Sequence, residues 1–272
     1  MRIVISAGMA GASGVASARD AAGSEAARRW LTDDINAAVE GAMENGATAF
    51  VLHLGGGPAQ SDVLLDLLHP AVEVIRGRPL VFYEETDLAR GYDGAFMIGL
   101  PARAGQNALL SRVLSWPLIR EVRLNGQPVG EAELAASLAA AYGIRTVLVA
   151  GDDRVCLDMQ RWSGGKVEAA VVKYSLSRHM ARCVSLIEAR ERIRNAASKA
   201  VDRLGAGGRP TSPLPSRLEV DFDEPEVARA VARMPEIGYD GGCTVRYLDE
   251  DFKRVYRVLV AMFWIATSRL NE

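Results

Sequence analysis

The sequence predicts an α/β protein, with a largely parallel sheet covered by helices on both faces and a second, smaller α/β lobe. Short runs rich in Ile, Val and Leu alternate with segments of helical periodicity through most of residues 1–150. Such runs are typical of parallel strands that are buried on both faces. Glycine-rich or polar loops follow several of the runs, and in open α/β sheets binding sites form at the carboxyl ends of strands.

The first strand is expected at residues 2–6, within MRIVISAGMAGASG, whose small residues let backbone or a ligand approach closely after the strand. A surface loop is expected at residues 15–24. A helix is predicted to begin near Thr32, because apolar residues recur at helical spacing until Asn45 and Gly46 end the pattern. The further expected elements are strands at 48–54, 80–83, 95–100 and 145–150, a short helix at 63–69 and an alanine-rich helix at 131–142.

Asn125 and Gly126 join two short runs, residues 121–124 and 127–129, and predict a β-hairpin with a type I′ turn. The pattern changes after Trp162. The elements expected there are strands at 167–173, 218–222 and 243–247, helices at 180–204, 225–233 and 251–269, and a Gly/Pro/Ser-rich surface linker at 205–217. We therefore expect an N-terminal lobe, residues 1–160, which carries the cleft, and a C-terminal lobe, residues 161–272.

Composition excludes several classes of function. The chain has 272 residues and a formal net charge of −2, so nothing indicates a nucleic-acid or anionic membrane partner. Its longest apolar run, residues 258–266, is shorter than the roughly 20 residues that span a bilayer. No secretory signal is recognisable, and three cysteines at unpaired spacing indicate reduced thiols, so we expect a cytoplasmic protein.

Two glycine-rich loops resemble known motifs only in part. Gly8, Gly11 and Gly14 follow a strand as in a dinucleotide-binding fingerprint, but no second strand ends in the required acidic residue. His53 precedes three glycines, as in the oxyanion loop of lipases, but the partner motif GxSxG is missing from the chain. Nucleotide binding and serine hydrolysis are therefore disfavoured, while His53 stays a candidate catalytic residue.

Three acidic residues have both a structural and a functional interpretation. Asp152 either caps the following helix or shapes a substrate pocket, and Asp153 either pairs with Arg154 or Arg103 or lines the same pocket. Glu131 either begins a helix, where the dipole favours a carboxylate, or is a buried functional acid. The residues alone leave these alternatives open.

Taken together, several stretches resemble the zinc D-aminopeptidases of the DppA type over essentially the whole chain. The stretches are MRIVISAGMAGASG, LTDDINAAVEGAMENGAT, LLHP, GAFMIGLPARAG, LNGQPVGE, VLVAGDDR, VVKYSLSR and MPEIGYDGGCTVRY. Their order and spacing make the resemblance specific. It implies a two-lobed α/β hydrolase that assembles into rings and binds two zinc ions through carboxylates and histidines.

The metal ligands that the resemblance implies are mostly replaced in this chain. Gly8 and Ala10 stand at the positions of two carboxylates, and Pro101 stands at the position of a ligand histidine. Arg112 aligns with a histidine implicated in catalysis, and only Glu131 is retained. Because a zinc ion needs about three or four N, O or S donors, we expect no metal and no other cofactor.

The expected cleft is wider and less negative than a zinc site. We expect Glu131 and His53 as its catalytic candidates. The expected ligand-binding positions are Arg103, Arg112, Asp152, Asp153, Gly8, Ala10 and Pro101.

Three functional hypotheses follow, and the sequence leaves open whether the protein is an enzyme. The first is a metal-free family member that binds a peptide or amino-acid-like ligand, with Arg103 or Arg112 holding a carboxylate and metal-independent chemistry as an option. The second is a non-catalytic homo-oligomeric scaffold that serves a partner protein. The third is an active D-aminopeptidase with relocated metal ligands.

Overall fold

Seven strands form the large sheet of this computed structural model, which describes residues 1–54, 63–76, 87–112, 118–205, 210 and 216–268. The strand order is β3-β2-β1-β4-β7-β8-β9, and every pairing is parallel except that of β8 with β9. The strands are β1 (Arg2–Ala7), β2 (Ala49–Leu54), β3 (Val72–Ile75), β4 (Gly94–Ile98), β7 (Arg145–Asp152), β8 (Glu168–Ser177) and β9 (Met180–Cys183). The expected, largely parallel sheet is confirmed; the strand expected at residues 80–83 lies outside the described residues.

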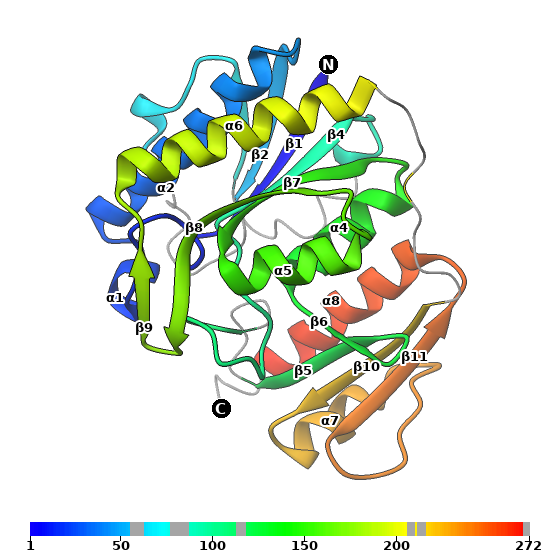
Figure 1. Ribbon diagram of the computed structural model, residues 1–272. Helices are drawn as coiled ribbons and strands as arrows, with labels where there is room; N and C mark the ends of the chain where they lie inside the picture. The colour runs from blue at the N-terminus through cyan, green and yellow to red at the C-terminus, as the bar shows by residue number, and fades with distance from the viewer. Residues whose placement is uncertain (55–62, 77–86, 113–117, 206–209, 211–215, 269–272) are drawn as a thin grey trace.

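Helices cover both faces of this sheet, as expected (Figure 1). Ile3 and Ile5 of β1 lie in one core cluster with the buried faces of α2 (Glu25–Met43) and α6 (Leu186–Gly205). Val4, which points to the opposite face, belongs to a second cluster with α4 (Glu131–Ala141) and α5 (Asp153–Trp162). The alternation along β1 therefore sends successive side chains into two separate cores.

A second, antiparallel sheet has the order β11-β10-β5-β6. Its strands are β5 (Ile119–Leu124), β6 (Gln127–Val129), β10 (Ser216–Phe222) and β11 (Thr244–Asp249), and it is packed by α7 (Pro225–Val231) and α8 (Phe252–Ser268). Asn125 and Gly126 have φ of 51° and 79°, which confirms the predicted type I′ turn between β5 and β6. Within the described part of the chain, no helix is both long and apolar enough to cross a bilayer.

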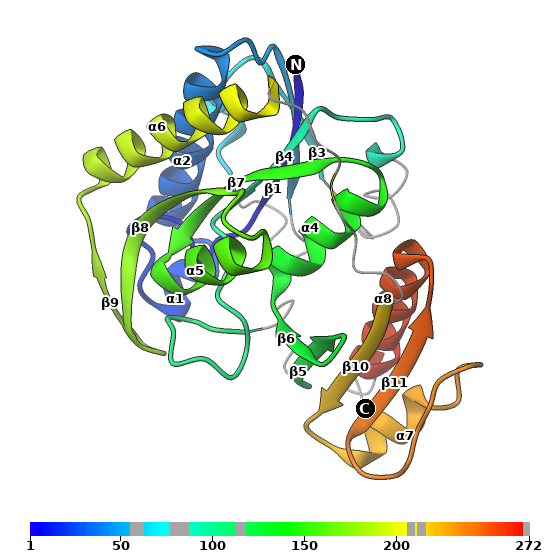
Figure 2. The same cartoon turned by 45° about the vertical axis from the view of Figure 1, so that its right-hand side comes forward.

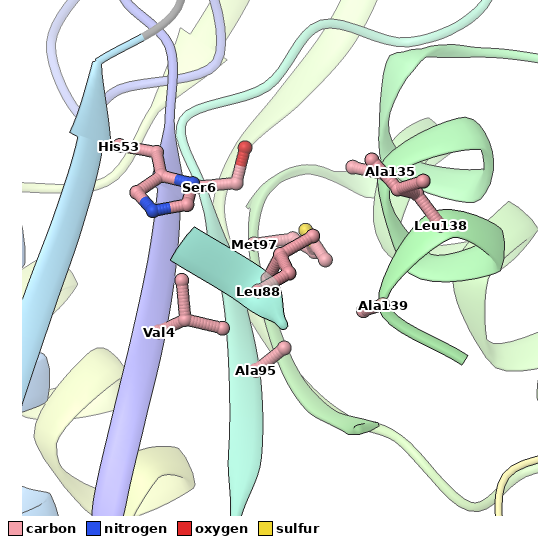
Figure 3. A pocket seen from close by; sticks show the side chains of 9 residues that line it. All are labelled: Val4, Ser6, His53, Leu88, Ala95, Met97, Ala135, Leu138 and Ala139. Atoms are coloured by element: carbon pink, nitrogen blue, oxygen red, sulfur yellow. The ribbon is translucent and has the colours of Figure 1, made fainter. Parts of the chain in front are cut away.

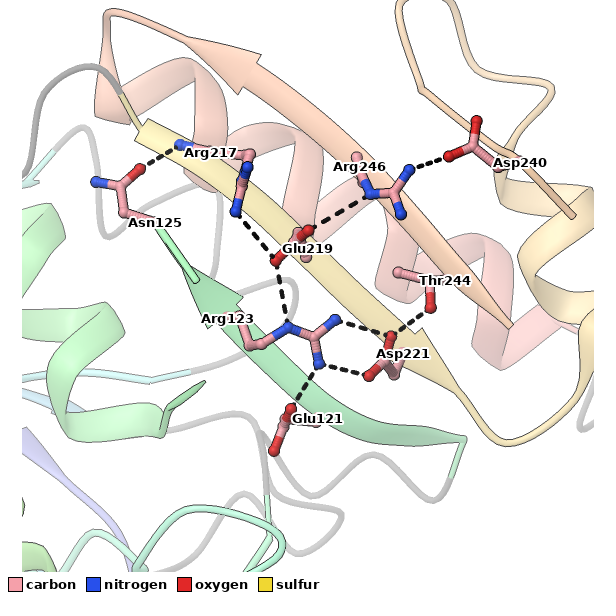
Figure 4. Close-up of polar contacts among 9 residues, drawn as sticks. All are labelled: Glu121, Arg123, Asn125, Arg217, Glu219, Asp221, Asp240, Thr244 and Arg246. Carbon is pink, nitrogen blue, oxygen red and sulfur yellow. Dashed lines mark hydrogen bonds and ion pairs between the residues drawn. The ribbon is translucent and has the colours of Figure 1, made fainter. Parts of the chain in front are cut away.

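The face of the second sheet away from α7 and α8 carries a charged network (Figure 4). Arg123 of β5 bonds Asp221 at 2.6 Å, Glu121 at 2.6 Å and Glu219 at 3.3 Å. Hydrogen bonding to Asp221 is the largest cause of the raised pKa of Arg123, and burial acts against it. Glu219 also contacts Arg246 at 3.4 Å, so this carboxylate links β5 to β11 across β10.

Several elements differ from the predictions. Residues 180–183 form β9 and pair with β8, so the helix expected at 180–204 begins only at Leu186, where Ser185 Oγ accepts the amide of Glu188. The helix expected near Thr32 begins at Glu25, because Ser24 caps it by accepting the amide of Ala27. The expected loop contains the short α1 (Ala18–Ala21), and the helix expected at 63–69 is reduced to the 3₁₀ turn η1 (Leu65–Leu67).

The two sheets do not divide the chain at residue 160. The β5–β6 hairpin of the expected N-terminal lobe lies in the second sheet, whereas β8, β9 and α6 of the expected C-terminal lobe complete the large sheet and its helical cover. Figure 2 shows the hairpin beside β10 and below α4. Sheet membership does not define folding units by itself, so the boundary at residue 160 stays a prediction.

The charged network predicts a difference between two arginines of β5. Arg123→Met removes a guanidinium shared by three carboxylates, and we expect the free energy of unfolding to fall by about 2 kcal/mol, since hydrogen bonds to charged groups contribute about 1.5–3 kcal/mol. Arg120→Met removes only a contact with the half-exposed Asp223, and we expect a change of less than about 0.5 kcal/mol. Urea unfolding of both variants measures this; equal losses would contradict it.

Candidate functional site

The loops that follow β1 and β4 meet at the carboxyl edge of the large sheet. The amide of Gly8 donates to Ile98 O at 2.9 Å, and that of Gly11 donates to Gly99 O at 2.7 Å. Gly99 has a φ of +69°, and a Cβ at this position would lie 2.1 Å from Gly8 O. The backbones therefore approach closely, and Gly8, Ala10 and Pro101 all lie in these two loops; a ligand-binding role for them stays a prediction.

A buried lysine holds the loop after β1 in place. Lys173 of β8 is fully buried, and its Nζ donates to the carbonyl oxygens of Ala10 at 2.7 Å, Ala12 at 2.9 Å and Val15 at 2.8 Å. Burial lowers the pKa of Lys173 to about 8, and the nearby Asp152 acts against this shift. Sequence reasoning missed this role, although a lysine within an otherwise apolar strand, VVKYS, was the available signal.

The two aspartates at the end of β7 have structural partners. Asp152 is fully buried and caps α5 by accepting the amides of Arg154 at 2.8 Å and Val155 at 3.1 Å. Asp153 accepts the amide of Ser175 at 2.7 Å and lies 3.5 Å from the guanidinium of Arg154. These contacts match the structural interpretation of both residues; a ligand-binding role for either stays a prediction.

The two candidate arginines differ in how they are engaged. Arg103 contacts Asp158 at 3.4 Å, and Asp158 also accepts a hydrogen bond from Gln106 at 2.6 Å. Arg112 is anchored through its backbone amide, which donates to Ala102 O at 3.1 Å. Its side-chain Nε is buried and has no hydrogen-bond partner within the described ranges. The Nε of Arg112 is therefore a donor that no described protein group uses, whereas the Nε of Arg103 faces Asp158.

Glu131 begins α4, as one of the two sequence interpretations had it. The carboxylate that caps this helix belongs to Glu133, whose Oε2 accepts the amide of Gly130 at 2.9 Å, and burial raises the pKa of Glu133 to about 7. Glu131 lies one turn before Ala135 on the same face of α4. That face borders a small cavity of about 30 Å³ between α4 and the large sheet, lined by Ser6, His53, Met97 and Ala135 among others (Figure 3).

His53 belongs to a buried polar network that the sequence did not reveal. Its Nε2 lies 2.8 Å from Asp87 Oδ2, which also accepts a hydrogen bond from the hydroxyl of Tyr92. Burial raises the pKa of Asp87, but hydrogen bonds from His53 and Tyr92 outweigh it and hold this pKa below its usual value. An ionised carboxylate only accepts, so Nε2 carries the proton and Nδ1 is the ring nitrogen left to accept one. The sequence did not predict this network because Asp87 and Tyr92 lie in no recognisable motif and their partner His53 is distant in sequence.

The comparisons with known proteins decide the family. A family model described as D-aminopeptidase (Peptidase_M55) matches residues 1–261. The chain belongs to the D-aminopeptidase family. A D-aminopeptidase from Bacillus subtilis (strain 168) is 25% identical over 243 residues, which cover 89% of this chain and 88% of the relative. The solved structure of the Zn-dependent D-aminopeptidase DppA from Bacillus subtilis, a self-compartmentalizing protease, matches with a TM-score of 0.87 at 24% identity over 98% of each chain.

The family implies zinc, and the side chains at the expected ligand positions of this D-aminopeptidase-family chain do not fit it. Gly8 and Ala10 carry no donor, and Leu100 Cδ2 lies 3.0 Å from where a Cβ of Gly8 would be. Pro101 is buried and lacks any side-chain donor, while Arg112 adds positive charge. Among the described residues, no three His, Cys, Asp or Glu side chains are grouped so that they could hold a metal ion. Among the expected ligand positions, Glu131 alone carries a carboxylate.

The low pKa of Asp87 predicts a pH-dependent contribution to stability. An acid whose pKa is lower in the folded state stabilises the fold above its ordinary pKa of 3.8, and this contribution is lost as the pH falls through the folded value. We expect Asp87→Asn to lower the free energy of unfolding by about 1–2 kcal/mol at pH 7. The difference from the natural chain should shrink below pH 4, as measured by urea unfolding at several pH values. A constant difference down to pH 3 would contradict this assignment.

Proposed function

We propose that this D-aminopeptidase-family protein has lost its dinuclear zinc centre and binds a peptide-like or amino-acid-like ligand at the carboxyl edge of the large sheet. The observation that carries the proposal is the buried Nε of Arg112, which lacks a hydrogen-bond partner among the described residues. A guanidinium whose Nε is unused is suited to a carboxylate, which arginine binds by paired, charge-assisted hydrogen bonds.

The charge balance of the site supports an anionic ligand group. With Gly8 and Ala10 in place of two carboxylates, the loop after β1 contributes no negative side chain to this edge. Lys173 already satisfies three carbonyl oxygens of that loop. Arg112 is permanently charged and has no acidic partner within the described ranges, so a ligand carboxylate would complete its hydrogen bonding.

His53 and Glu131 supply the acid–base groups for any metal-independent chemistry. Asp87 fixes Nε2 of His53, which leaves Nδ1 to exchange a proton. Glu131 lies at the start of the helix face that borders the same small cavity. We therefore favour a small peptide or amide as the substrate class. Its carboxylate would bind Arg112, and its amide bond would face His53 and Glu131.

Binding of a dipeptide tests the role of Arg112. We expect D-alanyl-D-alanine to raise the thermal unfolding temperature in a saturable manner, and D-alanyl-D-alanine amide, which lacks the carboxylate, to bind more weakly. Arg112→Met should lower the affinity for the dipeptide by at least about tenfold, because a charge-assisted hydrogen bond contributes about 1.5–3 kcal/mol. Arg112→Lys keeps the positive charge but loses the planar guanidinium, so its affinity for the dipeptide should lie between those of the natural chain and Arg112→Met.

Arg120→Met, on the distant second sheet, serves as the control and should bind as the natural chain does. Equal affinities of the natural chain and Arg112→Met would contradict the proposal. So would the absence of saturable stabilisation by the dipeptide, which would instead favour a non-catalytic scaffold.

A second proposal concerns assembly. We infer that the chain forms a homo-oligomer, such as a ring, through the edge of the large sheet at β9. Leu176, Met180 and Ile187, which flank this edge, expose 52%, 56% and 73% of their surface. An exposed edge strand flanked by large apolar side chains is typical of an interface. The related DppA is described as self-compartmentalizing, which agrees with assembly in the family.

Sedimentation velocity tests this interface. We expect Met180→Glu to shift the protein from an oligomer to smaller species, because a charge at a buried contact opposes association. Leu248→Glu is the matched control: Leu248 is 64% exposed but lies on β11 of the second sheet, and its replacement should leave the oligomer intact. A natural chain that sediments as a monomer, or a Met180→Glu variant that stays assembled, would contradict the inferred interface.

A further inference from the structure

A second and larger cavity lies between the two sheets, away from the site described above. Its volume is about 430 Å³, which is within the range of small-molecule sites. It is bordered by the β5–β6 hairpin, one face of α4, the first residues of β7 and the turn between α5 and β8. Because β7 begins here and carries Asp152 at its other end, the cavity is roughly 20 Å from the carboxyl edge of the sheet.

Small and apolar side chains open this cavity and form its walls. Ala136 and Ala140 lie one turn apart on α4, and neither extends beyond Cβ into the space. Val129 of β6 and the half-buried Trp162 at the end of α5 complete the apolar lining. A flat apolar group can therefore lie on the indole ring and against the alanine face of the helix.

The polar part of the lining is cationic. Arg145 donates to Leu204 O at 2.6 Å, and Arg203 contacts Glu168 at 2.5 Å, so each of these guanidinium groups has a protein partner. Lys166 is exposed at the rim, and its ammonium has no acidic partner in the described part of the chain. Thr146 Oγ1, at the start of β7, is buried without a hydrogen-bond partner there. The described lining therefore holds three cationic side chains and no acidic one, and the hydroxyl of Thr146 is left without a partner there.

We propose that this cavity binds a small carboxylic acid with an aromatic or apolar body. The carboxylate pairs with Lys166, Thr146 Oγ1 donates a hydrogen bond to it, and the body packs on Trp162, Ala136 and Ala140. This site is independent of the function proposed for the carboxyl edge, because it shares none of the residues assigned there. Its position between the two sheets is a common place for a ligand site.

The test uses 3-phenylpropionate, indole-3-acetate and hexanoate as probes, each with its uncharged amide, in isothermal titration calorimetry of the full chain. At least one acid should bind with a 1:1 stoichiometry, and its amide should bind about tenfold more weakly, because it loses the charge-assisted contacts. Raising the salt concentration should weaken binding of the acid, because Lys166 is exposed to solvent.

Four variants locate the site. Lys166→Met should weaken binding of the acid about threefold to fivefold, because a contact with a solvent-exposed ammonium contributes little, and Thr146→Val should also weaken it. Gln127→Trp, which fills the rim from the exposed start of β6, should abolish binding without touching the core. Lys199→Met, an exposed lysine outside the lining, is the matched charge control and should bind normally.

Several results would overturn this inference. One is an absence of binding by all three acids at about 5 mM, where a millimolar Kd is detectable. The others are equal affinities of the acid and its amide, and unchanged binding of the acid by both Lys166→Met and Gln127→Trp. Loss of binding in Arg112→Met alone would place the probe at the carboxyl edge instead. Circular dichroism and thermal unfolding of each variant separate a lost site from a lost fold.

Discussion

The ammonium of Lys173 is the interaction on which the carboxyl edge of the sheet depends. A charge enclosed by protein costs several kcal/mol in lost hydration, and only well-placed partners offset this cost. Here three carbonyl oxygens of the loop after β1 accept from one Nζ, and Asp152 and Asp34 contribute opposite charge. Asp34 fixes the same loop by accepting the amide of Ser13 at 2.8 Å and its hydroxyl at 2.5 Å. The loop conformation is therefore set by a side chain from β8 and one from α2.

The contacts of Lys173 explain how the loop after β1 keeps its conformation although its side chains bring no metal donor to the site. Its carbonyl groups point to the buried ammonium, Gly8 and Gly11 let it pack against the loop after β4, and Leu100 lies beside Gly8. The groups that we propose for chemistry at this edge are Arg112, Glu131 and His53, and Asp87 orients the imidazole of His53. A guanidinium, a carboxylate and an oriented imidazole suit the recognition of a charged organic ligand better than the coordination of zinc.

Local patterns in the sequence were sufficient for the parts of the fold that depend on local chemistry. Asn125 and Gly126 specified a hairpin because both residues adopt positive φ, and Asp152 was correctly considered as a helix cap because its side chain reaches amides two and three residues ahead. Pairing between distant segments was not accessible in this way. The Asp87–His53 bond and the Lys173 contacts join residues far apart in the chain, and the four residues of β9 are too few to show the period of a strand. Sheet membership also depends on pairing between distant segments. Local patterns therefore did not predict that the β5–β6 hairpin joins the second sheet, or that β8 and β9 join the large sheet.

The central claim is that the side chains at this edge do not bind zinc stoichiometrically. It is tested most directly by measuring the zinc content of the purified chain after incubation with zinc and dialysis, with the D-aminopeptidase of Bacillus subtilis treated in parallel as the positive control. Our account predicts zinc well below one ion per chain, alongside stoichiometric zinc in the relative. Stoichiometric zinc that survives dialysis in this chain, and that is lost on substitution of Glu131, would contradict it.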